Sequence, residues 1–397
     1  MRRLLSLDIK YSLTQALYLG AICALTGYAS VYLLGKGFSN SVIGIALALV
    51  SMLAVFTQPM IASFADKNQH IELRKIIAVI LVVVIALSVL IYFLKAPTIL
   101  LLCVFVGIST LMMTIQPLLN SLAFLFEKYG IEVNFGLARG IGSAAYALVS
   151  FALGYIVEDF GSSQIPLIYI IFNVIMFIVV YTYVIPQNEK REIQTHENKE
   201  QEETQLSFIE FLKKYKTFMV FVFGVVFVFF THTIINNFFI QIVTSVHGTE
   251  SQMGTAVFLA AILELPAMGL FNVIRTKVNC STLIKISVVL FAIKHGLTYI
   301  ASNMTMIYIA QALQMGSYAI FIPASVYYVN QVISKADSIK GQSMVTMAIT
   351  ASGIIANLMG GILLDAVGVQ SVLLIGEIVS IVGAVIVIIS IGNKKTA

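Results

Sequence analysis

Charged residues are scarce in this sequence. Asp, Glu, Lys and Arg together make up 11% of its 397 residues, whereas soluble globular proteins average about 25%. Hydrophobic residues make up 59% of the chain, and the mean hydropathy is +0.96. So little charge cannot cover the surface of a soluble domain of this size, and the composition therefore predicts a polytopic membrane protein.

Cysteine and histidine are also few, which argues against several kinds of site. The three cysteines, Cys23, Cys103 and Cys280, have neither metal-ligand nor disulfide spacing. The five histidines are scattered and form no grouping with cysteine. The sequence has no nucleotide-binding glycine loop and no nucleophile elbow. We therefore expect no enzyme activity, no metal ion and no ATP-binding domain in this chain.

Long apolar runs are what the sequence has in abundance. A hydrocarbon core needs roughly 20 apolar residues per helix, and twelve runs reach about that length. The N-terminus carries no small-residue cleavage site behind a short apolar run, so we expect a retained first helix. The predicted spans are 11–34, 41–64, 75–94, 97–119, 134–157, 164–185, 217–241, 251–274, 281–301, 304–329, 341–363 and 369–391.

The basic residues predict the orientation of these spans. Of the 24 Lys and Arg, 20 fall in the segments that are cytoplasmic if both termini are inside, and only Lys36 and Lys95 fall in the opposite turns. Lys and Arg concentrate in cytoplasmic loops, so we predict cytoplasmic termini. The net charge of +5 follows this membrane pattern and does not indicate nucleic-acid binding.

The longest polar segment divides the spans into six and six. We predict an N-terminal six-helix bundle over 1–185, a flexible cytoplasmic linker over 186–216 and a C-terminal bundle over 217–397. An internal repeat supports this division. Four pairs share an offset of 207 residues, and Pro117 and Pro323 are offset by 206. The four are Pro59 and Pro266, Gly154 and Gly361, Glu158 and Asp365, and Gly161 and Gly368. Homologous halves are typical of transporters that rock about a site between them.

The fifth span carries one permanent charge among small residues. Arg139 cannot lose its proton, so it must face protein, water or an anion rather than lipid. Tyr146 lies seven residues later, about two turns along the same face. Glycines and Ala145 give this helix a face on which another backbone can approach closely. The arginine and the ring suit a polar ligand with a flat apolar side, although Arg139 near a helix end can also simply snorkel.

Several stretches resemble the major facilitator superfamily, and within it the branch of lactose and phenylpropionate permeases, the oligosaccharide:proton symporters. The most specific are Phe-Gly-Leu-Ala-Arg-Gly-Ile-Gly at 135–142, Phe-Thr-Gln-Pro-Met-Ile-Ala-Ser-Phe-Ala-Asp-Lys at 56–67, and the segment from Glu264 through Lys294 to Gln314. The loop after the second span resembles the superfamily's Gly-x-x-x-Asp-Arg signature through Asp66 and Lys67. The resemblance implies that these two residues latch the two halves, although Ala62 replaces the leading glycine.

The resemblance also implies a substrate site. Arg139 matches the arginine that binds sugar hydroxyls in lactose permease, Tyr146 the aromatic on which the sugar stacks, and Asn120 a sugar-binding glutamate. Asn236 and Asn237 replace acids that pair with lysines there, and the lysine positions read Gln311 and Ile349 here. The two asparagines could contact a ligand or bond a neighbouring helix. Gln314 replaces a histidine of that site.

Coupling is expected at Glu264 and Lys294. Glu264 lies in the middle of a span before Pro266 and matches a coupling glutamate, while Lys294 matches an arginine. Unlike arginine, lysine can lose its proton when desolvated, so the pair could change its proton occupancy, or it could be a static ion pair. Ser317 replaces the family's proton-carrying glutamate. Glu377 lies in the last span, which we expect to be peripheral, and we expect His232 to be packed or water-facing.

The sequence thus predicts an all-α membrane protein with twelve spans in two pseudo-symmetric bundles. The expected function is proton-coupled uptake of a small polar solute such as a sugar or glycoside, driven by the proton-motive force with sodium as an alternative ion and no cofactor. Symport of an aromatic or organic acid, drug efflux, and a non-transporting membrane sensor or scaffold are the alternatives. We expect a monomer in a bacterial-type plasma membrane, with the lipid bilayer and a small solute as its partners.

Overall fold

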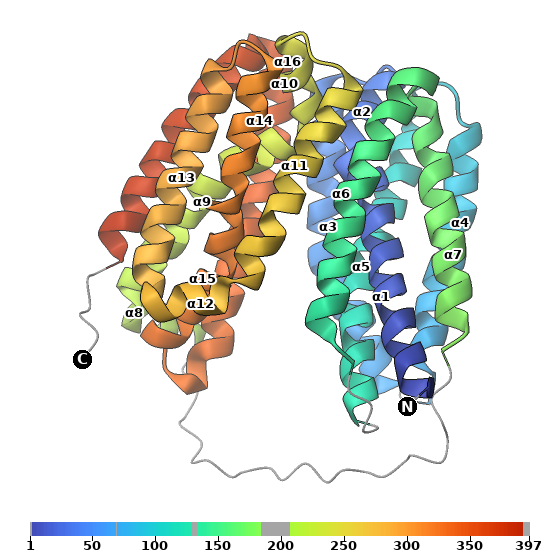
Figure 1. Cartoon of the computed structure of the whole chain (residues 1–397), viewed down its shortest axis with the longest axis horizontal. Coiled ribbons are helices and arrows are strands. Elements are labelled where there is room, and N and C mark those ends of the chain that lie inside the picture. Colours follow the sequence, from blue (N-terminus) through green and yellow to red (C-terminus); the bar gives the residue numbers. More distant parts are fainter. Residues whose placement is uncertain (1, 69, 129–132, 184–206, 392–397) are drawn as a thin grey trace. The chain divides into compact units, whose positions relative to one another are not determined.

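The structure is a computed structural model, and it describes residues 2–68, 70–128, 133–183 and 207–391. Every regular element in these ranges is a helix. The chain divides into two compact units, residues 1–196 and 197–397, labelled in Figure 1. The first contains α1 (Arg2–Ile22), η1 (Cys23–Gly27), α2 (Ala29–Gly35), α3 (Asn40–Lys67), α4 (Leu73–Phe93), α5 (Ile99–Lys128), α6 (Phe135–Phe160), η2 (Ser162–Gln164) and α7 (Ile165–Tyr181). The second contains α8 (Phe208–Lys214), α9 (Lys216–Asn237), α10 (Phe239–Ser245), α11 (Glu250–Gly269), α12 (Phe271–Lys277), α13 (Cys280–Ile300), α14 (Met304–Ala312), η4 (Leu313–Met315), α15 (Tyr318–Val332), η5 (Lys335–Asp337) and α16 (Ser338–Ser390).

The described helices account for twelve membrane spans. Ten helical segments are long and apolar enough to cross a bilayer, and a bent pair, Leu7–Gly27 with Ala29–Gly35, makes an eleventh. The last segment contains α16, which has 53 residues and would extend about 80 Å at 1.5 Å per residue, far beyond a hydrocarbon core of about 30 Å. Gly368 interrupts α16 with non-helical torsion angles. Because α16 holds two spans, the predicted twelve-helix membrane fold is confirmed.

The internal repeat is visible in the backbone. Gly161 ends α6 with φ 82° and ψ 162°, and Gly368, which lies 207 positions later, has φ 76° and ψ 173°. This region of torsion space is accessible essentially only to glycine. The same rare conformation at corresponding positions of the two units is what a duplicated helix–turn–helix segment would produce.

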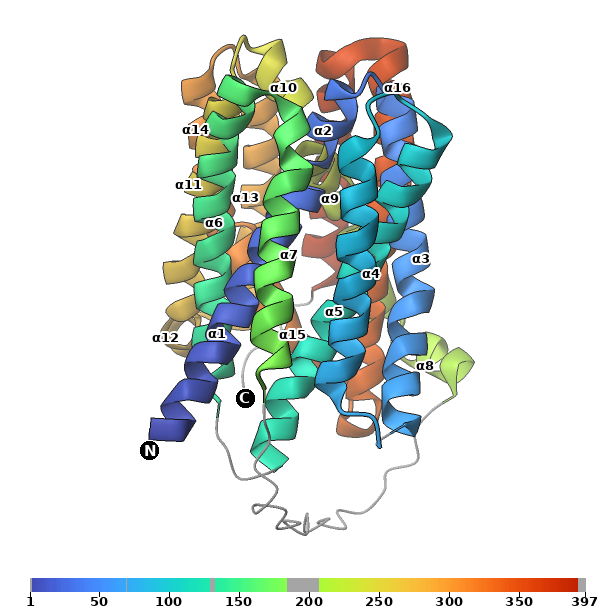
Figure 2. The ribbon, with the colours of Figure 1, turned by 90° about the vertical axis from the view of Figure 1, so that its right-hand side faces the viewer.

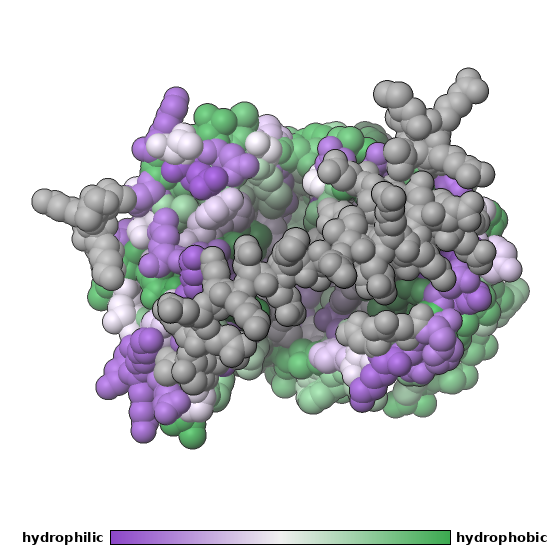
Figure 3. Space-filling view, turned by 90° about the horizontal axis from the view of Figure 1, so that it is seen from below, coloured by the Kyte–Doolittle hydropathy of each residue, from purple (hydrophilic) through white to green (hydrophobic). Residues whose placement is uncertain are grey.

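Each unit packs its own spans around a different central contact. In the first unit, α1 packs against α6 and α7, and α4 packs against α7 and α5 (Figures 1 and 2). In the second unit, α9 packs along α16, while α13 lies between α15 and α16. Aromatic rings from α9, α13 and α15 fill the core of this unit, with Phe229 touching both Phe291 and Phe321. On the face in Figure 3, hydrophilic side chains gather at the helix ends of each unit.

Cationic side chains cap the end of α7 in the first unit. Lys10 donates to the carbonyl of Thr182 at 3.1 Å, and Arg74 donates to the carbonyls of Tyr181 and Tyr183. The last carbonyls of a helix lack partners within the helix, and the macrodipole favours positive charge there. Arg74 also bonds Glu72 at 2.5 Å, and this bond lowers the pKa of the Glu72 carboxyl. The loop between α3 and α4 is thereby fastened to the last helix of its unit.

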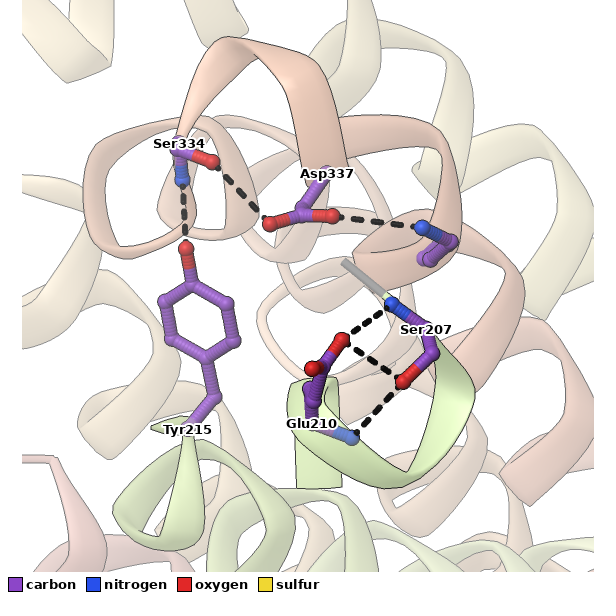
Figure 4. A network of polar contacts seen from close by, with 6 residues as sticks. Ser207, Glu210, Tyr215, Ser334 and Asp337 are labelled. Atoms are coloured by element: carbon purple, nitrogen blue, oxygen red, sulfur yellow. Dashed lines mark hydrogen bonds and ion pairs between the residues drawn. The ribbon is translucent and has the colours of Figure 1, made fainter. Parts of the chain in front are cut away.

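Part of the predicted linker is helical. The segment 184–206 lies outside the described residues, but α8 occupies seven positions that we had assigned to the linker. Its start is a capping box, in which the Ser207 hydroxyl accepts from the Glu210 amide and the Glu210 carboxylate accepts from the Ser207 amide (Figure 4). Two orphan amides are satisfied in this way. Phe211 is fully buried, so α8 is anchored to its unit by an apolar contact as well.

A second contact joins the start of α9 to the turn before α16 (Figure 4). The hydroxyl of Tyr215 accepts from the Ser334 amide at 3.2 Å. The Ser334 hydroxyl donates to Asp337 at 3.2 Å, and Lys340 bonds the other oxygen of the same carboxylate at 3.3 Å. These bonds hold the turn at one end of α16 in a fixed position against α9.

Candidate functional site

Arg139 belongs to a polar cluster in the first unit. It donates from a guanidinium nitrogen to the side-chain oxygen of Gln116 at 2.9 Å. The amide nitrogen of Gln116 in turn donates to the side-chain oxygen of Asn120 at 2.9 Å. Gln116 and Asn120 are four residues apart on α5 and therefore share one face of that helix. Both prediction candidates, Arg139 and Asn120, are thus brought together, and Gln116 is a member that the sequence analysis did not identify.

Arg139 is exposed and lies on the side of α6 that approaches α1. It is close enough to Tyr11 and Tyr18 of α1 to interact with them electrostatically. Two residues beyond Gly140, a Cβ added at Gly142 would lie 3.0 Å from the backbone oxygen of Gln15. At Gly142 the fifth span therefore approaches the backbone of α1, as expected for close helix packing in a membrane, whereas nothing lies within 4 Å of a Cβ at Gly140.

Tyr146 lies against an irregular turn in the first span. Residues Cys23–Gly27 form a π-helical turn, η1, between α1 and α2. A Cβ added at Gly27 would lie 2.7 Å from the Tyr146 hydroxyl oxygen, closer than a real Cβ contact allows. Single π-turns inside helices are frequent at functional sites. Tyr146 is partly buried, and its hydroxyl occupies the space left by the missing side chain of Gly27.

The second unit holds a chain of three side chains from three spans. Lys294 on α13 donates to the side-chain oxygen of Gln314, and the amide nitrogen of Gln314 donates to the carboxylate of Glu264 on α11 at 2.9 Å. Lys294 is 0% exposed and Gln314 is 6% exposed. The amide thus presents its oxygen to the ammonium and its nitrogen to the carboxylate. The predicted pair is therefore brought into one network, but through Gln314 rather than by a direct ion pair.

Gln314 owes its position to a break in the tenth span. The span runs through α14, the short 3₁₀ turn η4 and α15, and Gln314 is the central residue of η4. Just after the break, the carbonyl of Ser317 accepts from the Phe321 amide at 3.0 Å and also from the Ser287 hydroxyl of α13 at 2.6 Å. Broken spans whose freed groups are satisfied by neighbouring helices are a common way to place polar groups in transporters.

Two buried histidines lie beside this chain. His232 of α9 is 4% exposed and His295 of α13 is 1% exposed, and their ring centroids are 6.3 Å apart. His232 stacks on Tyr318 at 5.3 Å and bonds the side-chain amide of Asn236 through Nε2 at 3.0 Å. His295 bonds the Ser380 hydroxyl of α16 through Nδ1 at 2.7 Å. His232 is therefore packed, and it also contacts one of the two candidate asparagines.

The two asparagines of α9 have different surroundings. Asn237 donates to the side-chain oxygen of Asn357 on α16 at 2.6 Å, and Asn357 is 2% exposed. Asn236, in contrast, is exposed and bonded only by its amide nitrogen to His232 among the contacts of the described residues. The geometry thus favours helix–helix bonding for Asn237 and leaves Asn236 as the ligand candidate of the pair.

The remaining predicted residues lie apart from these clusters. Lys67 is the last residue of α3 and is exposed, and the side chain of Asp66 lies outside the described part of the structure. The latch function of this pair stays a prediction. Glu377 lies on α16, where a Cβ added at Gly296 would be 3.1 Å from one of its carboxylate oxygens. Glu377 thus lies against α13, and its expected peripheral position stays a prediction.

The sequence of this chain has been compared with known proteins and families. The model of the MFS_1 like family matches residues 8–375. The chain belongs to this family. It is a membrane transporter of the major facilitator type, with a small molecule as its substrate. The match supports the superfamily predicted from the sequence but does not single out the lactose permease branch.

Individual relatives are distant. The uncharacterized transporter YwbF of Bacillus subtilis is 23% identical over 350 residues, which cover 87% of this chain and 83% of that protein. A putative sugar efflux transporter of Deinococcus radiodurans is 30% identical, but over only 96 residues, 24% of this chain and 25% of that protein.

Solved structures resemble the whole fold. The crystal structure of a mutant of the nucleoside transporter NupG has a TM-score of 0.80 at 15% identity and covers 97% of this chain and 100% of that chain. A bacterial homolog of the human lysosomal transporter Spinster, inward-facing and occupied, has a TM-score of 0.62 at 14% identity, covering 97% of this chain and 94% of that chain. At this identity the likeness concerns the fold alone.

Proposed function

We propose that this protein is a proton-coupled symporter that takes up a sugar or glycoside by alternating access. The observation that carries the proposal is the chain from Lys294 through Gln314 to Glu264. A buried ammonium and a carboxylate that share one neutral amide have no role in a passive membrane scaffold, because each costs free energy inside a bilayer. A carboxylate in this setting can exchange a proton when access to water changes.

The chemistry of the two clusters supports a hydroxyl-rich solute. In the first unit, Arg139, Gln116 and Asn120 offer a planar donor fork and two amides. The second unit, taken by itself, offers the side-chain oxygens of Asn236 and Glu264. Alternating donors and acceptors suit the hydroxyls of a sugar, and the ring of Tyr146 suits its apolar face. Nucleosides are themselves glycosides, so the fold of the nucleoside transporter NupG supports including them among the candidates.

An organic acid is the second candidate substrate, because Arg139 could bind a carboxylate bidentately. The name of the Deinococcus relative, a putative sugar efflux transporter, supports a sugar with the opposite direction of transport. The test below therefore needs to resolve direction as well as substrate.

Uptake by the purified protein in proteoliposomes tests the proposal. Labelled lactose, methyl β-galactoside, uridine and phenylpropionate would each be offered with an acidic exterior, so that the proton gradient is directed inward, with no gradient, and with an inward sodium gradient instead. We expect accumulation of a glycoside or nucleoside only under the proton gradient. Accumulation of phenylpropionate alone would favour the acid symporter, and loss of preloaded sugar against an acidic exterior would favour efflux. Transport of none of the four would contradict the proposed function.

The setting of the protein is part of the same proposal. We place it in a bacterial-type plasma membrane as a monomer with both termini in the cytoplasm, because the basic residues concentrate on that side. The driving force is the proton-motive force, with sodium as the alternative that the gradient experiment distinguishes.

A further inference from the structure

His232 restricts the way in which Asn236 can meet a ligand. The side-chain nitrogen Nδ2 of Asn236 lies 3.0 Å from Nε2 of His232. An amide nitrogen donates but does not accept, so with the amide in this orientation Nε2 is the accepting atom and the ring hydrogen lies on Nδ1, which has no hydrogen-bond partner among the described residues. Because the two branches of an amide point apart, the oxygen Oδ1 of Asn236 is directed away from His232.

The surroundings of His232 keep it in this state. The ring is 4% exposed, stacks on Tyr318 at 5.3 Å and meets Phe229 and Phe291 with their planes tilted by about 80° and 76°. Aromatic rings thus pack against the imidazole on several sides. The positioning of Asn236 is therefore built into the core of α9, α13 and α15.

We propose that His232 is a positioning residue that fixes Asn236 as a hydrogen-bond acceptor, so that the transported solute must supply a hydroxyl or N–H donor at this point. The inference rests on the proposed function, because it takes Asn236 to be a ligand contact. It goes further by assigning the polarity of one recognition position. A solute that offers only acceptors there, such as a carboxylate or an ether oxygen, would meet the amide oxygen without a hydrogen bond.

The chain offers a matched set of variants for the test. In His232→Gln, the side-chain oxygen reaches as far as the imidazole Nε2 and can accept from Asn236. In His232→Leu, a side chain of similar reach keeps the apolar contacts but accepts nothing, so the amide of Asn236 is free to turn over. His295→Gln is the control, because His295 is an equally buried neighbour whose polar contact is Ser380.

The first measurement needs no substrate. Nuclear magnetic resonance of the full-length protein with isotope-labelled histidine side chains reports the tautomer of each ring, and the sequence has only five histidines. The signal that disappears in His232→Gln belongs to His232. We expect a neutral ring with the hydrogen on Nδ1, and a changed Nε2 signal in Asn236→Leu. A hydrogen on Nε2, or a charged ring, would overturn the proposal whatever the protein transports.

The second measurement concerns recognition. Uptake of uridine and of methyl β-galactoside would each be compared with uptake of analogues that lack one hydroxyl at a time. One of these hydroxyls is expected to donate a hydrogen bond to Asn236. In the wild type and in His295→Gln, the analogue that lacks this hydroxyl should be taken up about tenfold less than the parent solute, the equivalent of one hydrogen bond. In His232→Leu this ratio should fall to about one, and His232→Gln should restore it.

The outcomes separate this inference from the proposed function. An unchanged discrimination ratio in His232→Leu would overturn the positioning role. If the wild type transports neither uridine nor the galactoside, the proposed function fails for these solutes, while the tautomer of His232 still decides whether Asn236 is held as an acceptor.

Discussion

The hydroxyl oxygen of Tyr146 lies 2.7 Å from the place where a Cβ on Gly27 would stand. The next Tyr146 atom, Cζ, is 3.5 Å from that place, which is an ordinary contact. A side chain at position 27 would therefore clash with the hydroxyl of Tyr146 and not with its ring. Keeping Gly27 avoids this clash, and so does removing the hydroxyl of Tyr146.

Gly27→Ala should displace the ring of Tyr146 and lower the apparent affinity for the transported solute about tenfold, because a stacking ring must be held in place to act. Tyr146→Phe alone should be mild. The double variant should recover to the level of Tyr146→Phe, since the ring then fits beside the new methyl group. Concentration dependence of uptake measures this. Gly107→Ala is the control, because nothing lies within 4 Å of a Cβ there; a double variant as poor as Gly27→Ala would contradict the prediction.

Arg139→Lys should weaken solute binding although the charge is kept. A lysine lacks the planar fork that lets arginine bond Gln116 and a ligand at the same time. We expect a loss of about tenfold in binding measured by ligand-dependent thermal stabilisation of the purified protein. Binding at the wild-type level would show that Arg139 only snorkels toward the membrane surface.

Gln314→Leu should destabilise the protein, because it leaves the fully buried Lys294 without the oxygen to which it donates. Losing one partner of a buried charge typically costs about 3–5 kcal/mol. Removing the charge as well, in Gln314→Leu with Lys294→Met, should recover much of the loss, so the two changes should be strongly non-additive. Thermal unfolding in detergent tests this. Equal melting temperatures for wild type and Gln314→Leu would mean that Lys294 finds another partner.

Glu264→Gln should abolish accumulation of solute under a proton gradient. The substitution imitates the protonated carboxyl and keeps an oxygen that can accept from Gln314. Exchange of internal for external solute should persist, since exchange does not require release of a proton. Counterflow and gradient-driven uptake in the same proteoliposomes measure the two processes. Gradient-driven accumulation by Glu264→Gln would assign coupling to another group, of which Glu377 and His232 are the next to test.

A cysteine introduced at Glu200 should react with an impermeant maleimide only in inverted vesicles. The expectation follows from the distribution of Lys and Arg, and the chain has only three cysteines of its own to be replaced for the background. Labelling of intact cells from outside would reverse the predicted orientation of every span.

The sequence was sufficient for the spans and the repeat, because hydropathy and repeat offsets are properties of the chain read in order. It also contained two signals within single helices. Gln116 with Asn120, and His232 with Asn236, are each four residues apart in apolar stretches, the spacing at which side chains meet on a helix. Composition and charge alone do not reveal such pairs, because Gln116 and Asn120 are uncharged and neither His232 nor Asn236 forms a motif by itself.

Contacts between different helices could be identified only from the folded structure. The bond of Gln314 to both Lys294 and Glu264 joins residues from three spans, and spacing in the sequence does not reveal which side chain stands between two charges. The 3₁₀ turn that places Gln314 is followed by a carbonyl, that of Ser317, which bonds Ser287 of another helix. Hydropathy identifies membrane spans but does not identify a helix as short as α8. That helix is specified by its capping box and by one buried ring, that of Phe211.

Gly161 and Gly368 make the same turn with a single residue conformation that other amino acids rarely adopt. Each is therefore constrained in a way that most residues of the two units are not, since a substitution would strain the backbone even where there is open space. The two glycines thus provide a fixed register for superposing one half of the chain on the other, residue by residue.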